Sequence, residues 1–114
     1  MVYLQHPVSE DRPVHIGLIG AGWIGNFHAE SIAHRIPNAR LEAIADPALP
    51  AVEALAGRVG VAKISADPED VINDPAIEAV LIAAPVRFHS GLIASAARAG
   101  KHAFCEKPGG RTVQ

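Results

Sequence analysis

The stretch HIGLIGAGWIGNFHAE, residues 15–30, decides the fold. The apolar run at 14–20 ends in closely spaced glycines, which is typical of a buried strand followed by a tight turn. Residues 23–36 have helical spacing, and Pro37 ends the helix. One polar stripe runs along this helix: Asn26, Glu30 and His34. Because the rest of its surface is apolar or small, we expect the helix to be largely covered.

Strands and helices alternate along the rest of the chain. The pattern predicts further strands at 39–46, 61–65, 77–85 and 101–108. It predicts further helices at 50–58, from Pro68 to about 73, and at 87–99. The second of these begins with Asp67 as cap and Pro68 in the first turn. Since the connections are short, we expect an α/β fold with a doubly wound sheet of five parallel strands.

Composition sets broad limits on function. The 114 residues amount to one domain, and 49% of them are hydrophobic, which is enough for a packed core. The net charge is -2 and no basic block occurs, so we expect neither a nucleic-acid partner nor binding to a membrane surface. No apolar run is long enough to span a bilayer.

Few residues suggest redox or metal chemistry. The N-terminus lacks the apolar core of a signal peptide, and Cys105 is a lone cysteine, so we expect a reducing, cytoplasmic setting. We expect Cys105 to be a small buried side chain rather than a nucleophile. The histidines are not grouped with acids or cysteines, so no metal site is expected.

Gly20, Gly22 and Gly25 form a G-x-G-x-x-G pattern between the expected strand and the expected helix. The first glycine permits a tight turn, the second lets backbone approach a phosphate, and the third lets helix and strand pack closely. Free N–H groups at the helix start favour phosphate as well. The pattern predicts a pyrophosphate-binding loop of these residues: Gly20, Ala21, Gly22, Trp23, Ile24 and Gly25. The alternative is a turn with a structural role only.

Asp46 supplies the acid that a dinucleotide-binding fold needs at the end of its second strand, roughly 20 residues after the last glycine. Its carboxylate can accept hydrogen bonds from the adenosine ribose and would repel a 2′-phosphate. Pro47 and Ala48 follow it, in place of the arginine that usually accepts that phosphate. We therefore expect NAD, with NADP less favoured. The alternative is that Asp46 and Pro47 only end a strand.

Three blocks of sequence, in this order, carry a resemblance to a known family: GLIGAGWIGNFHA, IADP, and IAAPVRFHSGLIASAARAGKHAFCEKP. Over residues 14–108 the chain resembles the N-terminal half of the glucose–fructose oxidoreductase / inositol 2-dehydrogenase family. The resemblance implies a Rossmann domain, a nicotinamide cofactor, and a parent enzyme that transfers hydride between the cofactor and a secondary alcohol of a polyol or sugar.

The resemblance also implies roles for particular residues. Lys107 corresponds to an active-site lysine that binds the substrate hydroxyl and helps to move its proton, and Glu106 belongs to the same motif. Ala84, Pro85 and His89 match the segment that lines the ribose and nicotinamide side of the cofactor. For two of these residues an alternative without a functional role stays open. Lys107 could be an ordinary solvated lysine, and His89 could bond only a backbone carbonyl.

Two prolines and mixed polar residues suggest an N-terminal arm at 1–13. The resemblance implies a dinucleotide-binding domain (14–108) and the start of a following segment (109–114). Family members continue into a sixth strand and a C-terminal α/β domain that provides the substrate pocket and the oligomer interface. We expect this chain to lack that domain, as a fragment, a truncated protein or a degenerate gene product. The full-length protein would bind a polyol or sugar and form a homo-oligomer. The rivals are a stand-alone NAD(H)-sensing module and a vestigial cofactor domain.

Overall fold

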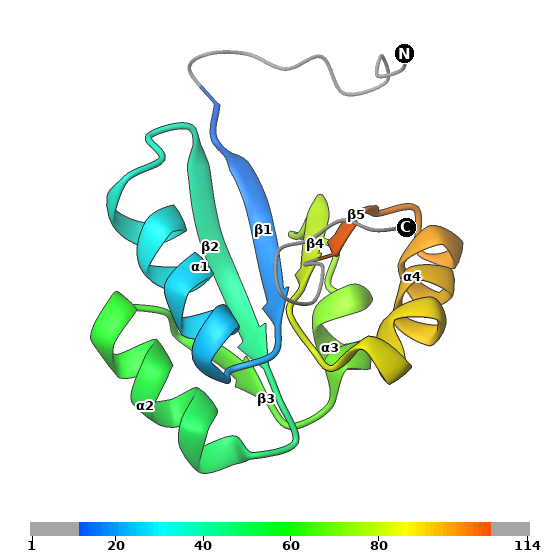
Figure 1. The fold of residues 1–114 in the computed structure, drawn as a ribbon. Coiled ribbons are helices and arrows are strands. Elements are labelled where there is room, and N and C mark those ends of the chain that lie inside the picture. Colours follow the sequence, from blue (N-terminus) through cyan, green and yellow to red (C-terminus); the bar gives the residue numbers. More distant parts are fainter. Residues whose placement is uncertain (1–11, 106–114) are drawn as a thin grey trace.

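Five parallel strands form a sheet in the computed structural model, which describes residues 12–105 (Figure 1). The strands are β1 (Val14–Ile19), β2 (Ala39–Ala45), β3 (Lys63–Ser65), β4 (Ala79–Ile82) and β5 (His102–Cys105). Their order in the sheet is β3-β2-β1-β4-β5. Each neighbouring pair is parallel. The chain thus winds outward from β1 to β3 and then crosses to the other side of β1.

Helices cover both faces of this sheet. They are α1 (Trp23–His34), α2 (Leu49–Val59), α3 (Pro68–Ile72) and α4 (His89–Arg98), with a 3-10 turn, η1 (Val86–Phe88), before the last. Helices α1 and α2 lie on one face, and α3 and α4 lie on the other (Figure 1). The expected doubly wound α/β sheet of five strands is confirmed.

The core consists of two apolar clusters, one on each face of the sheet. Side chains of a strand alternate between them, because successive Cβ atoms point to opposite faces. In β1, Leu18 packs with the cluster under α1 and α2, and Ile19 packs with the cluster under α3 and α4. Ile44 and Ala45 divide in the same way in β2. Burial of this apolar area holds the three layers together.

Helix α1 departs from two expectations. It ends at His34, two residues before the expected end at 36. It is also not largely covered within the described part of the chain, since Trp23 is 80% exposed and Phe27 is 54% exposed. The residues that α1 buries are Gly25, Ala29 and Ile32. These lie three and four positions apart, so only one face of the helix reaches the sheet.

The other elements follow the sequence more closely. Asp67 caps α3 as expected, because its side chain accepts a hydrogen bond from the Glu69 N–H over 2.9 Å. The strand expected at 77–85 is shorter, since β4 spans Ala79–Ile82. The helix expected at 87–99 begins as the 3-10 turn η1 and becomes α-helical at His89.

A β-bulge in β2 places Glu42 on the face that α3 and α4 cover. Ile16 pairs with Leu41, and Gly17 pairs with Ala43, so Glu42 is an extra residue in the ladder. Leu41 belongs to one core cluster and Ala43 to the other, and Glu42 lies between them. Because of this extra residue, the successive side chains of Glu42 and Ala43 both lie on the face opposite α1.

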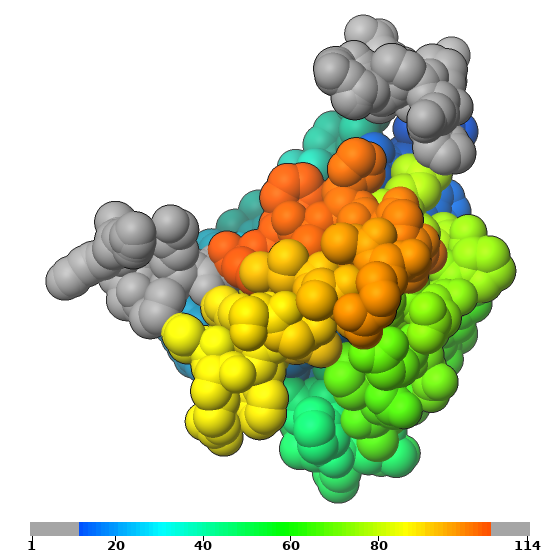
Figure 2. Space-filling model, turned by 90° about the vertical axis from the view of Figure 1, so that its right-hand side faces the viewer, coloured from blue at the N-terminus to red at the C-terminus, as the bar shows by residue number. Residues whose placement is uncertain are grey.

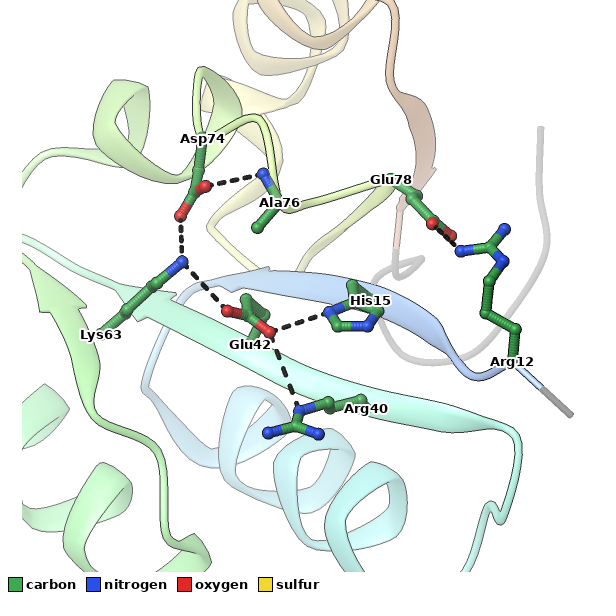
Figure 3. A network of polar contacts seen from close by, with 8 residues as sticks. All are labelled: Arg12, His15, Arg40, Glu42, Lys63, Asp74, Ala76 and Glu78. Carbon is green, nitrogen blue, oxygen red and sulfur yellow. Dashed lines mark hydrogen bonds and ion pairs between the residues drawn. The ribbon is translucent and has the colours of Figure 1, made fainter. Parts of the chain in front are cut away.

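Glu42 is the centre of a polar network on that face (Figure 3). Its carboxylate lies 3.0 Å from Lys63 Nζ and 2.9 Å from His15 Nδ1, and Lys63 also pairs with Asp74 over 3.1 Å. The hydrogen bonds from Lys63 and His15 lower the pKa of Glu42. The Ala76 N–H and Lys63 lower the pKa of Asp74, and both carboxylates raise the pKa of Lys63. His15 and Lys63 lie at the amino ends of their strands, so the network is far from the carboxyl edge of the sheet.

Residues 12–105 hold no membrane-spanning helix and no cluster of metal-ligating side chains. None of the helices in this part of the chain has the length and apolar character to cross a membrane. This part of the chain also contains no group of three or more His, Cys, Asp or Glu side chains placed to hold a metal ion.

Candidate functional site

A cavity of about 690 Å³ opens at the carboxyl edge of the sheet. Residues at three strand ends line it: Ile19 at the end of β1 with Gly20 after it, Asp46 and Pro47 after β2, and Ala84 and Pro85 after β4. Figure 2 shows the side of the molecule that carries η1 and α4 (yellow to orange), α3 (green) and the loop after β2 (blue-green). The chain reverses its winding direction between β1 and β4, and open α/β sheets bind ligands at such switch points.

The glycine loop has the close approaches that its pattern predicts. Gly20 has a φ of +115°, and an added Cβ would lie 2.7 Å from the backbone of Ala83. Its N–H donates to the Ala45 carbonyl over 2.8 Å, which ties the loop to β2. A Cβ on Gly25 would lie 1.9 Å from the Gly20 carbonyl oxygen. Two of the three glycines are therefore required by the packing of the chain itself.

Gly22 differs from these two glycines. A Cβ there would meet no atom within 4 Å, and its φ of -79° is open to other residues. Gly22 is the N-cap of α1, which has no side-chain cap and no acid in its first turn. The first N–H groups of a helix lack intrahelical acceptors and carry a partial positive charge. Open space beside uncapped N–H groups fits an anionic ligand such as a pyrophosphate.

The Asp46 carboxylate joins the glycine loop to the end of β2. Its Oδ2 accepts a hydrogen bond from the Ala21 N–H over 2.9 Å, and its Oδ1 accepts one from the Ala48 N–H over 2.8 Å. A carboxylate has about four acceptor positions, so two remain for ligand hydroxyls. Asp46 also lines the cavity. The arrangement fits the recognition of ribose hydroxyls beside a phosphate loop.

The segment after β4 forms the opposite wall of the cavity. Ala84 and Pro85, two of the residues expected near the cofactor, line it. His89, the first residue of α4, lies 2.8 Å through its Nε2 from the Ala84 carbonyl. Because a carbonyl only accepts, Nε2 carries the proton in this contact. His89 thus bonds a backbone carbonyl, which is one of the two interpretations that the sequence left open for it.

Trp23 and Ile24 occupy the first turn of α1 and are not among the cavity-lining residues. Trp23 instead borders a second hollow, which Phe27 and Arg35 also line. What Trp23 offers to a ligand at the loop is its backbone N–H.

The expected catalytic residue, Lys107, and Glu106 lie outside the described residues. Cys105 is half-buried against the cluster under α4, and burial raises the pKa of its thiol. A raised thiol pKa disfavours the thiolate, which agrees with the small buried side chain expected at this position.

Several cavity residues were not predicted from the sequence to belong to the site. They follow strand ends or belong to α3, η1 and α4: Pro47, Pro68, Glu69, Arg87, Phe88, Gly91, Leu92, Ser95 and Arg98. Ser95 donates to Glu69 over 2.7 Å and accepts from Arg98 over 3.4 Å, which links α3 to α4. For the residues that follow strands, position in the sequence could have indicated the site, because residues just after parallel strands meet at one edge of the sheet. Ser95 and Arg98 lie in the second half of α4, away from any strand end, so their position in the sequence gave no such signal.

Comparisons with known proteins agree with this geometry. A family model described as "Oxidoreductase family, NAD-binding Rossmann fold" matches residues 14–114. The scyllo-inositol 2-dehydrogenase (NAD(+)) of Bacillus subtilis is 37% identical over 98 residues, which cover 86% of this chain and 29% of that protein. The myo-inositol 2-dehydrogenase of Thermotoga maritima is 41% identical over 95 residues, which cover 83% of this chain and 28% of that protein.

Solved structures give the same picture. The scyllo-inositol dehydrogenase from Lactobacillus casei with bound NAD(H) and scyllo-inositol superimposes with a TM-score of 0.81 at 36% identity. The match covers 85% of this chain and 28% of that one. The chain thus spans less than a third of the length of the relatives that it matches.

Proposed function

Because the chain belongs to the oxidoreductase family with an NAD-binding Rossmann fold, we propose that it binds NAD(H) at the glycine loop and Asp46. The open space at Gly22, beside the uncapped start of α1, carries this proposal. The pyrophosphate would lie against the N–H groups of the first turn, and the adenosine ribose would bond Asp46. The adenine would enter the cavity between the ends of β2 and β4.

The proposed parent activity is the oxidation of a polyol or sugar with inositol-like secondary alcohols. The nicotinamide supplies the chemistry by accepting a hydride from a carbinol carbon. Lys107 is the residue proposed to bind the substrate hydroxyl and assist removal of its proton, and Glu106 the residue proposed to support it. The three relatives compared above are named dehydrogenases and give no support to a stand-alone sensing module.

A matched pair of glycine variants tests the cofactor site. An added Cβ meets no atom within 4 Å at Gly22 or at Gly57, an exposed position in α2. Gly22→Ala should weaken NADH binding by about tenfold, which equals ~1.4 kcal/mol. Gly57→Ala should leave NADH affinity unchanged. Calorimetry measures both, and equal NADH affinity in the two variants would refute binding at this loop.

Trp23 provides a second readout of the same site. It is the only tryptophan in the sequence and lies at the first position of α1. Its emission overlaps the absorption of reduced nicotinamide, so bound NADH should quench Trp23 and emit by energy transfer. Saturation with NADH by calorimetry without any change in Trp23 emission would place the cofactor away from Gly20–Gly25.

A further inference from the structure

The side chain of Asn26, which is not part of the G-x-G-x-x-G pattern, binds two carbonyl groups of the glycine loop. Asn26 Nδ2 donates to the Ala21 carbonyl over 2.9 Å and to the Gly22 carbonyl over 2.9 Å. The two hydrogens of one amide group are thus used on two consecutive peptide units. Asn26 is one turn into α1, on the polar stripe that the sequence displays.

A second residue holds Asn26 in this orientation. Arg58, near the end of α2, donates through Nη2 to Asn26 Oδ1 and through Nε to Glu30 over 3.4 Å. A guanidinium only donates and a carbonyl only accepts, so the Asn26 amide has a single orientation that satisfies both sides. Arg58 therefore acts on the glycine loop through Asn26, across the contact between α2 and α1.

These bonds set the direction of the loop N–H groups. A trans peptide unit is planar, and its C=O and N–H point in opposite directions. The Asn26 side chain binds the carbonyls of Ala21 and Gly22, and the Asn26 backbone N–H also donates to the Gly22 carbonyl over 2.9 Å, so the N–H groups of Gly22 and Trp23 point the other way. Asp46 holds the preceding peptide unit through the Ala21 N–H. Three consecutive peptide planes are thus fixed before any ligand arrives.

We propose that Asn26 and Arg58 are positioning residues that preorganise the glycine loop for a diphosphate. This inference rests on the proposed function, because it needs the loop to be the diphosphate site. Preorganised donors bind an anion without an ordering cost at the moment of binding. The polar stripe of α1 thereby has a role beyond solvation, since its first member faces the loop and its second member shares Arg58.

Binding of ADP and of adenosine to the full chain separates positioning from general stability. Asn26→Leu is close in size, is neutral and has no donor. It should weaken ADP binding by about tenfold and leave adenosine affinity within about twofold. Arg58→Lys keeps the charge and loses the planar guanidinium. It should also weaken ADP binding, by less than Asn26→Leu does. His34→Gln changes the same stripe at its exposed end and should leave both affinities unchanged.

The exchange rate of the Ala21 amide proton gives a readout that needs no ligand. That amide is bonded to Asp46, and a loosened loop should make it exchange faster in Asn26→Leu than in His34→Gln. Parallel loss of ADP and adenosine affinity, or unchanged ADP affinity in Asn26→Leu, would overturn the inference. If the unmodified chain binds neither ADP nor NADH, the proposed function fails. The exchange rate then still decides whether Asn26 orders the loop.

Discussion

Gly25 of α1 lies so close to Gly20 that a Cβ on Gly25 would be 1.9 Å from the Gly20 carbonyl oxygen. This contact joins the first turn of α1 to the end of β1. It therefore sets how near the start of the helix comes to the carboxyl edge of the sheet. Because the atom at 1.9 Å belongs to the backbone, no rotamer change can relieve a clash there.

Gly25→Ala should reduce the free energy of unfolding. Overpacking of this kind costs about 1–3 kcal/mol, and a backbone neighbour puts the cost at the upper end. Gly57→Ala is the matched control, because its Cβ would meet no atom within 4 Å, and it should stabilise α2 by up to about 1 kcal/mol. Urea unfolding measures both. An unfolding midpoint for Gly25→Ala equal to that of the unmodified chain would contradict the contact.

Asp46→Ala should weaken NADH binding and narrow the preference for NADH over NADPH. The variant removes the acceptor for ribose hydroxyls and the charge that repels a 2′-phosphate. Asp74→Ala is the matched control. Asp74 accepts from the N–H two residues on over 2.8 Å, as Asp46 does, but at the other end of the sheet. Titration of each variant with NADH and with NADPH measures both affinities. Tighter NADPH than NADH binding by the unmodified chain would count against the role of Asp46.

The polar network should make stability fall in acid. Glu42 and Asp74 have folded pKa values below their ordinary 4.5 and 3.8, so the unfolded chain binds more protons as the pH drops. Their stabilisation is present above the ordinary values and is lost as pH falls through the lowered folded values. Lys63→Met should flatten this acid dependence, and added salt should reduce it, since Lys63 is partly exposed. Urea midpoints between about pH 6 and pH 2 measure the slope. An equal slope in Lys63→Met would argue against the network.

The edge formed by β5 should promote self-association at high concentration. Within residues 12–105, β5 pairs with β4 on one side, and Phe104 on β5 is 60% exposed. Unpaired edges with exposed apolar side chains recruit other chains. Phe104→Lys should lower the association seen by sedimentation. Phe27→Lys, at an exposed aromatic of α1, should have a smaller effect. A monomeric unmodified chain at high concentration would show that the edge is not available.

The local patterns in the sequence were reliable guides to the elements and to the individual glycines. The period of apolar residues, the cap at Asp67 and the glycine spacing all depend on geometry within a few residues, which covalent structure and sterics impose wherever the chain lies. Asp46 was identified for the same reason, because its distance from Gly25 follows from the length of one helix and one strand.

Contacts between distant segments were decided by the tertiary structure alone. The sequence predicted a phosphate loop, and it displayed an acid after the second strand and a polar stripe on the first helix. Only the packing of α2 beside α1 brought Arg58 to Asn26, and only the register of β1 with β2 brought Glu42 to His15 and the α3 face. A shift of one residue in that register reverses which face a side chain occupies, and no local pattern encodes where a bulge will fall. The sequence by itself therefore specified which residues could bind a dinucleotide, and the assembled sheet decided which groups hold them in place.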